Sequence, residues 1–174
     1  HNHVRCNLRK TMNFGTDINE FLKSSAKRAL GGNTPKSLRK ASIKLKDKEV
    51  QWLCVLDFSA TEDDIEDCAI AGTEIIADFT WEYGINEMFE KVKPNEKPRA
   101  LINVVYERLE RNFNEREIDE KEWITENNYC GKCKKADTGL NYPIEYEFDG
   151  KIYVDGICKV CGTSCSTEMK IKTE

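Results

Sequence analysis

Histidine is nearly missing from this sequence of 174 residues, where it occurs only as His1 and His3. The side chain that most often serves as a general acid or base is therefore confined to the first three positions. The sequence also contains no G-x-S-x-G, no phosphate-binding P-loop and no G-x-G-x-x-G. The many carboxylates would still allow a carboxylate-based hydrolase. The missing motifs nevertheless favour a binding protein, and we expect no enzyme activity.

Long apolar runs are also absent, and none approaches the ~18 residues that a membrane-spanning helix needs. The opening residues do not resemble a secretory signal, and 33% of all residues are charged. These features predict a soluble cytoplasmic protein with no membrane contact. Residues 1–11 look like a leader or a tag-derived tail, because Met12 is a suitable natural start. We therefore leave them, with His1 and His3, out of the fold and metal predictions.

Cysteine, in contrast, is plentiful, and four of the eight cysteines form a pattern. Cys130 and Cys133 make one C-x2-C pair, and Cys158 and Cys161 make a second pair after 24 intervening residues. Two such pairs supply four thiolates, the tetrahedral set that Zn²⁺ prefers. Four thiolates leave no open position for a substrate. The pattern therefore predicts a structural zinc site.

The segment between the two pairs predicts a β-hairpin. Apolar residues alternate with charged ones from Ile144 to Phe148, and the alternation resumes at Ile152. Asp149-Gly150 between these runs is a signal for a two-residue type I′ turn. Such a hairpin would bring the second cysteine pair back to the first, which is typical of a zinc ribbon.

Two other interpretations of these cysteines have less support. Disulfides would need an oxidising compartment, and a thioredoxin-like redox pair would need one C-x-x-C beside a βαβ unit. Cys165 lies near enough to substitute as a ligand, but we interpret it as a bystander. Cys6, Cys54 and Cys68 have no partner at metal-site spacing. Cys54 alternates with apolar neighbours, which predicts a small buried core residue.

Hydrophobic periodicity predicts an α+β domain before the ribbon. A helix should begin near Asp17 and end at Gly31-Gly32, and two strands should follow over 41–46 and 50–58. Ser59 or Thr61 should cap a second helix. Residues 81–92 suggest a short helix or a loop, and residues 100–109 a third strand.

The expected fold is thus a small antiparallel sheet with packed helices, in the order α-β-β-α-β-α, plus a C-terminal zinc ribbon. The expected division is an α+β domain over 12–112, a linking helix over 113–128 and the four-cysteine zinc ribbon over 129–174.

Charge is strongly segregated along the chain. Residues 1–56 carry a balance of +8, and residues 57–96 a balance of −10. The densest acidic run lies at the start of the predicted second helix and comprises Glu62, Asp63, Asp64, Glu66 and Asp67. The helix dipole accounts for two or three of these carboxylates, but like charges three and four residues apart repel. The run lacks the spacing of a calcium loop. We predict an acidic surface that binds a basic partner; a solvated face paired with the lysine-rich first strand remains an alternative.

The ribbon itself, residues 129–174, has seven lysines and seven acidic residues, a balance of zero. Nucleic-acid-binding modules usually show a net basic face. Lys132, Lys134 and Lys135 could form a small local patch, but the composition argues against nucleic acid as the partner. It favours a ribbon that stabilises the fold or docks another protein.

Several segments between residues 18 and 109 also resemble a known group of proteins. They are 29–35 (ALGGNTP), Leu38-Arg39 before a hairpin, 62–67 (EDDIED) and 73–79 (TEIIADF). The pattern is similar to small acidic immunity proteins that accompany bacterial colicin-like and contact-dependent toxins. The resemblance implies a cytoplasmic, non-enzymatic protein that binds a toxin domain, often a basic nuclease, and blocks its active site. The C-terminal zinc ribbon departs from that pattern.

Three functional hypotheses follow. The first is an immunity-type protein that neutralises a basic bacterial toxin domain through its acidic surface. The second is a ribbon that binds nucleic acid through Lys132, Lys134, Lys135 and the basic first strand. The third is a regulatory adaptor that docks a protein partner through the ribbon.

Overall fold

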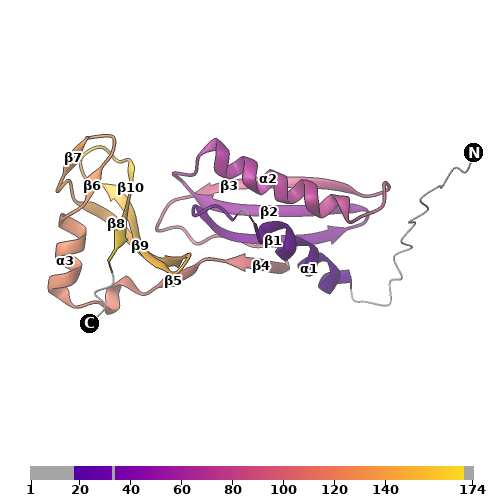
Figure 1. Ribbon diagram of the computed structural model, residues 1–174, viewed down its shortest axis with the longest axis horizontal. Coiled ribbons are helices and arrows are strands. Elements are labelled where there is room, and N and C mark those ends of the chain that lie inside the picture. Colours follow the sequence, from indigo (N-terminus) through magenta and orange to yellow (C-terminus); the bar gives the residue numbers. More distant parts are fainter. Residues whose placement is uncertain (1–17, 33, 171–174) are drawn as a thin grey trace, which may run out of the picture.

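The structure is a computed structural model that describes residues 18–32 and 34–170. The predicted tail, its two histidines, Cys6 and the Asp17 cap lie outside the described residues. Figure 1 shows two bodies side by side, and a single extended segment, β4 (Asn103–Glu107) followed by β5 (Leu109–Arg111), runs from one to the other. No helix in the described ranges is long and apolar enough to span a membrane.

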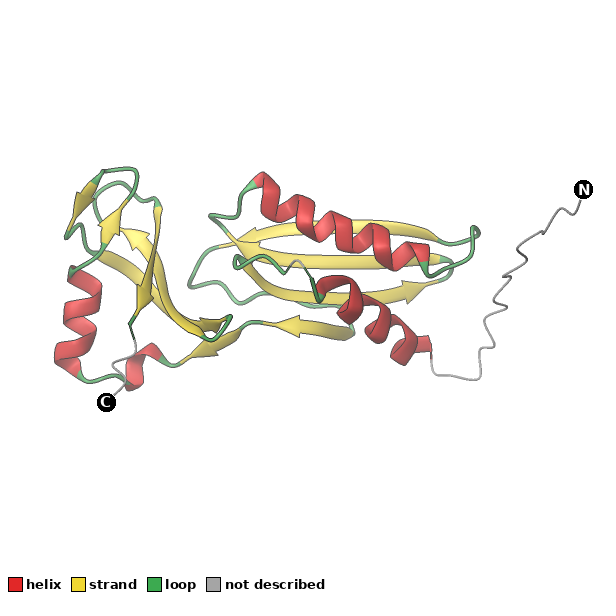
Figure 2. Cartoon of the chain, viewed as in Figure 1, coloured by secondary structure: helices red, strands yellow, loops and turns green. Residues whose placement is uncertain are grey.

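The first body, which we call the first module, is a four-stranded sheet covered on one face by two helices (Figures 1 and 2). Its elements are α1 (Ile18–Leu30), β1 (Leu38–Lys46), β2 (Glu49–Asp57), α2 (Glu62–Ala77), β3 (Gly84–Val92) and β4. The strand order is β3-β2-β1-β4. β1 pairs antiparallel with β2 and with β4, whereas β2 and β3 are parallel. The α+β class is therefore confirmed, and the sheet is mixed.

Strand β3 differs from the sequence prediction, which assigned residues 81–92 to a short helix or a loop. Its apolar residues are Ile85, Met88, Phe89 and Val92, a spacing that matches one face of a helix. The segment instead pairs in parallel with β2 along its full length, from Glu49↔Gly84 to Asp57↔Val92. Helix α2 supplies the crossover that parallel neighbours require. The observed order thus has one strand more than expected in this region.

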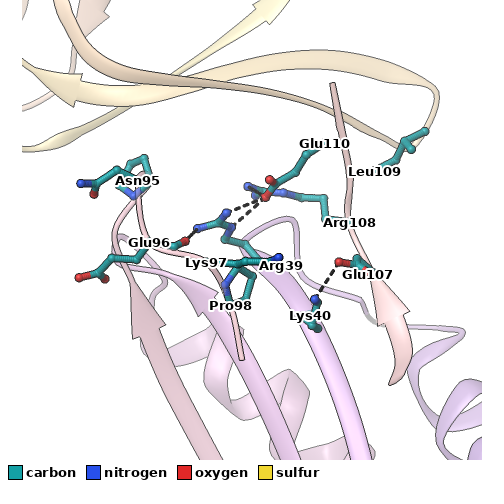
Figure 3. Close-up of a pocket in the computed structure, with 11 residues that line it drawn as sticks. Arg39, Lys40, Asn95, Glu96, Lys97, Pro98, Glu107, Arg108, Leu109 and Glu110 are labelled. Atoms are coloured by element: carbon teal, nitrogen blue, oxygen red, sulfur yellow. Dashed lines mark hydrogen bonds and ion pairs between the residues drawn. The ribbon is translucent and has the colours of Figure 1, made fainter. Parts of the chain in front are cut away.

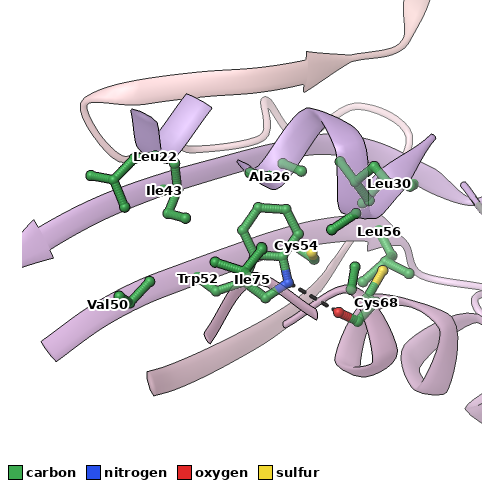
Figure 4. Close-up of a cluster of buried hydrophobic side chains, with 14 of the residues drawn as sticks. Leu22, Ala26, Leu30, Ile43, Val50, Trp52, Cys54, Leu56, Cys68 and Ile75 are labelled. Atoms are coloured by element: carbon green, nitrogen blue, oxygen red, sulfur yellow. Dashed lines mark hydrogen bonds between the residues drawn. The ribbon is translucent and has the colours of Figure 1, made fainter. Parts of the chain in front are cut away.

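The core of the first module lies between the helices and the sheet (Figure 4). Leu22 and Ala26 of α1 and Ile75 of α2 pack with Trp52 and Cys54 of β2. The indole Nε1 of Trp52 donates to the carbonyl oxygen of Cys68 at 3.0 Å, which satisfies the one polar atom of this large side chain. The prediction that Cys54 is a core residue is confirmed, since it has no exposure to solvent.

The connection between β3 and β4 is held to β1 by polar contacts. The backbone N–H of Leu101 donates to Oγ of Ser42, and Nη1 of Arg39 donates to the carbonyl oxygens of Lys93 and Glu96. Ser42 and Arg39 are both buried. The connection therefore satisfies two polar side chains of β1.

The second module runs from β5 to β10 and has its own core. It contains the 3₁₀ helix η1 (Phe113–Glu115), α3 (Ile118–Glu126), β6 (Tyr129–Cys130), β7 (Lys135–Ala136), β8 (Leu140–Phe148), β9 (Lys151–Cys158) and β10 (Ser164–Met169). One sheet has the order β10-β9-β8-β5, and β6 pairs with β7 in a small second sheet. Ile124 of α3 and Phe113 are buried in this core with Leu140 and Val154. Helix α3 therefore packs on this module and occupies part of the segment predicted as a linking helix.

The hairpin predicted between the cysteine pairs is present as β8 and β9. Phe148 pairs with Lys151, so Asp149 and Gly150 form a two-residue turn. Their φ angles are 50° and 70°, which is the positive-φ pair of a type I′ turn. The hairpin places Cys158 at the end of β9, opposite Leu140.

Candidate metal centre and partner surface

The four cysteines of the two C-x2-C pairs converge at one end of the second module. Their Sγ atoms all lie within 4.8 Å of one another, and those of Cys130 and Cys161 are 3.5 Å apart. A tetrahedral ion with metal–sulfur distances of about 2.3 Å places its sulfurs about 3.8 Å apart. Cys130 and Cys158 are buried, and Cys133 and Cys161 are partly exposed. The donor set and its spacing therefore fit a metal ion bound by four cysteines.

The backbone forms similar tight turns, or knuckles, around the two cysteine pairs. In the first, the backbone N–H of Cys133 points to Sγ of Cys130 at 3.4 Å; in the second, the N–H of Gly162 donates to the carbonyl of Cys158 at 3.0 Å. The residue after each second cysteine has a positive φ, 51° at Lys134 and 70° at Gly162. Glycine adopts this conformation readily, whereas lysine does so at a cost.

The electrostatics of the sulfur cluster favour a cation at its centre. The Thr138 hydroxyl, with the backbone N–H groups of Cys161 and Val160, lowers the pKa of Cys158 to about 6. A hydrogen bond to the sulfur of Cys161 raises the pKa of Cys133 to about 12. Four adjacent thiols cannot all ionise unless a positive charge offsets their repulsion. A soft divalent ion, which prefers thiolate ligands, would supply that charge if it were bound there.

Cys165 lies beside this centre without belonging to the four. It is buried in β10, and its Sγ is 3.9 Å from the carbonyl oxygen of Thr163. It packs in the same core as Cys130 and Cys158. The interpretation of Cys165 as a bystander agrees with this position.

The acidic run lies where it was expected, at the N-terminus of α2. Thr61 is the N-cap, and its Oγ1 accepts from the backbone N–H of Asp64 at 3.2 Å. The Asp64 carboxylate accepts from the backbone N–H of Thr61 at 2.8 Å, which completes a capping box. Asp64 therefore has a structural role, and the predicted cap at Thr61 is confirmed.

The other four carboxylates of the run, Glu62, Asp63, Glu66 and Asp67, have no such role. The first three are exposed and Asp67 is partly exposed. Within the described part of the chain, no ion pair joins any of them to a lysine or arginine, including the lysines of β1. Internal pairing with the lysine-rich strand, the alternative from the sequence, is therefore not observed among these residues.

Other acidic residues of the same region are paired. Asp78 contacts Arg28, Glu82 contacts Lys48 and Glu90 contacts Arg99. The unpaired carboxylates are thus concentrated in the first half of α2. One helical turn after Glu66, Ile70 is 43% exposed. The outer surface of α2 therefore combines free negative charge with one accessible aliphatic side chain.

A polar network joins the two modules, and no sequence pattern indicates it. Arg39 of β1 donates through Nε and Nη2 to Glu110 of β5 at 3.0 and 2.8 Å, and beside it, within the first module, Lys40 pairs with Glu107 at 2.8 Å (Figure 3). These residues, with Arg108, line an open cavity of ≈ 690 Å³ beside the β3–β4 connection. Arg39 and Glu110 are 71 residues apart in the chain, so no local periodicity indicates their contact.

Arg108 is the centre of this network. Its Nη1 donates to Asp57 at 2.6 Å, and its guanidinium lies 3.7 Å from the ring centroid of Tyr146 in β8. The hydroxyl of Tyr146 donates to Asp155 at 2.8 Å. Burial raises the pKa of Asp57, and the positive charges of Arg108 and Arg39 counteract that shift.

A second set of contacts lies next to Arg108. Tyr146 stacks on Tyr153 with ring centroids 5.7 Å apart. Nζ of Lys36 lies 4.1 Å from the Tyr153 ring and donates to Oγ of Ser166 at 2.7 Å. Lys36 precedes β1, and its two partners belong to β9 and β10. The modules are thus joined by charged and aromatic side chains.

Comparison with known proteins identifies the first module. A search of curated proteins finds no match to the chain. The family described as MafI2 immunity protein matches residues 19–110. The matched segment runs from α1 into β5 and includes the acidic run, Arg39 and Arg108; most of the second module lies beyond it. The resemblance to immunity proteins is thereby confirmed, and it implies an inhibitor of a toxin protein. The chain belongs to the MafI2 immunity protein family.

Proposed function

We propose that this chain neutralises a toxin domain by binding it through the exposed face of α2 formed by Glu62, Asp63, Glu66, Asp67 and Ile70. The observation that carries the proposal is the absence, within the described residues, of any internal cation that pairs with these carboxylates. An unpaired acidic surface attracts a basic partner over a distance and matches its charges on contact.

The composition of this face also suits binding. Ile70 is accessible one turn after Glu66, so it can be buried against a partner while the carboxylates remain at the rim. The carboxylates then contribute mainly to the association rate and to partner choice, and the aliphatic contact contributes to the lifetime of the complex. Asp64 is excluded from this role because it caps the helix.

We further propose that Cys130, Cys133, Cys158 and Cys161 bind Zn²⁺ as a structural ion. Zn²⁺ matches four thiolates in tetrahedral geometry, and the sulfurs are already gathered within 4.8 Å. When bound, the ion would fix the two knuckles against each other. A cytoplasmic location agrees with this proposal, because a reducing compartment keeps thiols available for metal.

We expect a cognate toxin domain to be encoded beside the gene for this chain, and that domain is used to test the toxin-binding proposal. We expect the triple variant Asp63→Asn, Glu66→Gln, Asp67→Asn to bind this domain at least about tenfold more weakly, a loss of about 1.4 kcal/mol. The loss should shrink as salt is added, because screening removes the electrostatic part. Isothermal titration calorimetry over a salt series measures both effects.

A matched variant with the same change of charge serves as the control. Glu117→Gln, Asp119→Asn and Glu122→Gln neutralise three exposed carboxylates of α3 and its N-cap, which form no ion pair within the described chain. This variant should bind as tightly as the unmodified protein. Equal affinities of the two triple variants would reject the α2 face as the contact surface.

A further inference from the structure

Four lysines surround the cysteine centre of the second module. Lys132 lies within the first knuckle, Lys134 and Lys135 follow it, and Lys159 lies within the second. All four are exposed, and none forms an ion pair within the described residues. Because the four sulfurs lie within 4.8 Å of one another, Lys132 and Lys159 extend from adjoining turns. Lys132, Lys134 and Lys135 are neighbours in the sequence, and the fold adds Lys159 to them.

The position of Lys159 is fixed by a close approach to Gly139. The backbone N–H of Lys159 donates to the carbonyl of Gly139 at 3.0 Å. A Cβ atom at Gly139 would lie 2.6 Å from Cδ of Lys159, so the side chain rests against the bare glycine backbone. Gly139 lies just after β7, whose Lys135 pairs with Cys130. The second-knuckle lysine therefore lies against the segment that carries the lysines of the first.

The charge balance of zero over residues 129–174 conceals this cluster of lysines. Residues 129–139 and 158–163 contain the four lysines and a single acidic residue, Asp137. Other acidic residues, among them Glu147, Asp149 and Glu168, lie in the strands and the turn of the β8–β9–β10 sheet, where Glu168 pairs with Lys151. The surface formed by residues 129–139 and 158–163 is thus basic, although residues 129–174 taken together are neutral.

Exposed apolar side chains accompany these charges. Tyr129, directly before Cys130, is 60% exposed, and Val160, in the second knuckle, is 72% exposed. Lysines near an accessible aromatic ring match a nucleic-acid strand, whose phosphates pair with ammonium groups and whose bases stack on aromatic faces. An acidic protein segment would use the lysines but offers no bases to stack on Tyr129.

We propose that the knuckle surface, formed by Lys132, Lys134, Lys135 and Lys159 with Tyr129, binds single-stranded nucleic acid through its phosphate backbone. This activity is separate from toxin binding, which we assign to α2 of the first module. The proposal does not depend on the identity of the toxin, and each can fail without the other.

The test uses the full chain, loaded with Zn²⁺, and a fluorescently labelled single-stranded RNA of mixed sequence. Fluorescence anisotropy over a salt series gives the affinity and its dependence on salt. Replacing the four lysines by glutamine should weaken binding strongly and lower the slope of log affinity against log salt by about 3, since each lost phosphate contact contributes about 0.7. Tyr129→Ala should weaken binding with no change in this slope.

The matched control replaces Lys27, Lys93, Lys97 and Lys170 by glutamine. These lysines are also exposed and form no ion pair among the described residues, and they lie outside both cysteine knuckles and outside β1. We expect this variant to bind RNA with the same salt slope as the unmodified protein. Metal content and the unfolding temperature are measured for every variant, so that a misfolded protein is recognised.

Three results would overturn the proposal. The first is no binding of RNA by the unmodified chain at low salt. The second is an equal loss in the knuckle and control variants, which would indicate general charge attraction. The third is that poly-glutamate binds as tightly as RNA and that Tyr129→Ala does not weaken its binding. This result would indicate an acidic protein as the partner. Toxin affinity measured on the knuckle variant should stay unchanged.

Discussion

Arg108 places its guanidinium between the two modules, where the side chain has no exposure to solvent. It pairs with Asp57 of the first module and stacks on Tyr146 of the second. Removing Arg108 leaves the buried Asp57 carboxylate with only the longer ion pair to Arg39, at 3.8 Å, in a poorly hydrated site. Arg108 therefore matters for stability chiefly because, without it, the buried negative charge of Asp57 would be poorly compensated.

We expect Arg108→Met to lower the free energy of unfolding by about 3–5 kcal/mol. Arg108→Lys should recover little of this, because lysine lacks the planar fork that both pairs with Asp57 and stacks on Tyr146. Asp57→Asn should lower the free energy of unfolding much less in the Arg108→Met protein than in the unmodified protein. Urea unfolding of the four proteins in this cycle provides the measurement, and additive losses would show that the two residues do not interact.

Gly139 allows a second prediction about a single residue. It has a φ of 73°, and its missing Cβ leaves room for Lys159. Gly139→Ala should destabilise the second module by about 1–2 kcal/mol, because an L side chain is strained in the left-handed region.

The matched control is Gly131→Ala, in the first knuckle. Gly131 has an ordinary φ, and a Cβ there would meet no atom within 4 Å. Thermal unfolding of both variants compares them, and we expect Gly131→Ala to change stability by less than about 0.5 kcal/mol. If Gly139→Ala left the stability of the protein unchanged, the turn at this position would have to be able to rearrange.

At the scale of secondary-structure elements, α2 combines a cap with a proposed contact face, and the two can be separated. Thr61→Ala removes one side of the capping box and should cost about 0.5–2 kcal/mol of stability. It leaves Glu62, Asp63, Glu66 and Asp67 unchanged, so toxin affinity should stay within about twofold. The neutralising triple variant should show the opposite behaviour, with weak binding and nearly normal stability. Chemical denaturation measures the stability of both variants, and calorimetry on the same samples measures their toxin affinity. A large loss of affinity in Thr61→Ala would mean that the end of the helix itself forms the contact.

Elements with strong local signals could be predicted from the sequence. The cysteine pairs, the Asp149-Gly150 turn and the cap of α2 each depend on residues close together in the chain. Strand β3 could not be recognised, because Ile85, Met88, Phe89 and Val92 repeat with a helical period and only the pairing with β2 makes the segment a strand. Strand β10 also lacks a clear alternation and forms by pairing with β9.

The contacts between the modules could not be predicted for a related reason. Asp57 and Arg108 are 51 residues apart, and neither has a distinctive neighbourhood in the sequence. The acidic run could be identified by counting charge, but its lack of internal partners is a property of the folded chain. Likewise, the zero charge balance of residues 129–174 gives no sign of the knuckle surface, because only the folded hairpin brings Lys159 close to the other three lysines.

At the scale of the whole molecule, the two modules have separate hydrophobic cores. The core around Trp52 and the core around Val154 share no residue, and polar and aromatic side chains join the modules. When one module unfolds, the loss of a polar interface of this kind destabilises the other module less than the loss of a shared apolar core would. The metal-dependent part of the molecule should therefore be the second module alone.

We accordingly predict that removing the metal with a chelator unfolds the second module and leaves the first folded. Hydrogen exchange should become fast in β8, β9 and β10 while β1 and β2 stay protected, because structural metal sites supply folding free energy directly. Toxin affinity should change by no more than a few-fold, since the proposed contact lies on α2. A Cys158→Ser variant, which lacks one of the four sulfurs, should resemble the chelated protein and respond little to the chelator. Fast exchange throughout the first module would show a single cooperative unit. Loss of toxin binding while β1 and β2 stay protected would place the toxin contact on the second module, as the adaptor hypothesis requires.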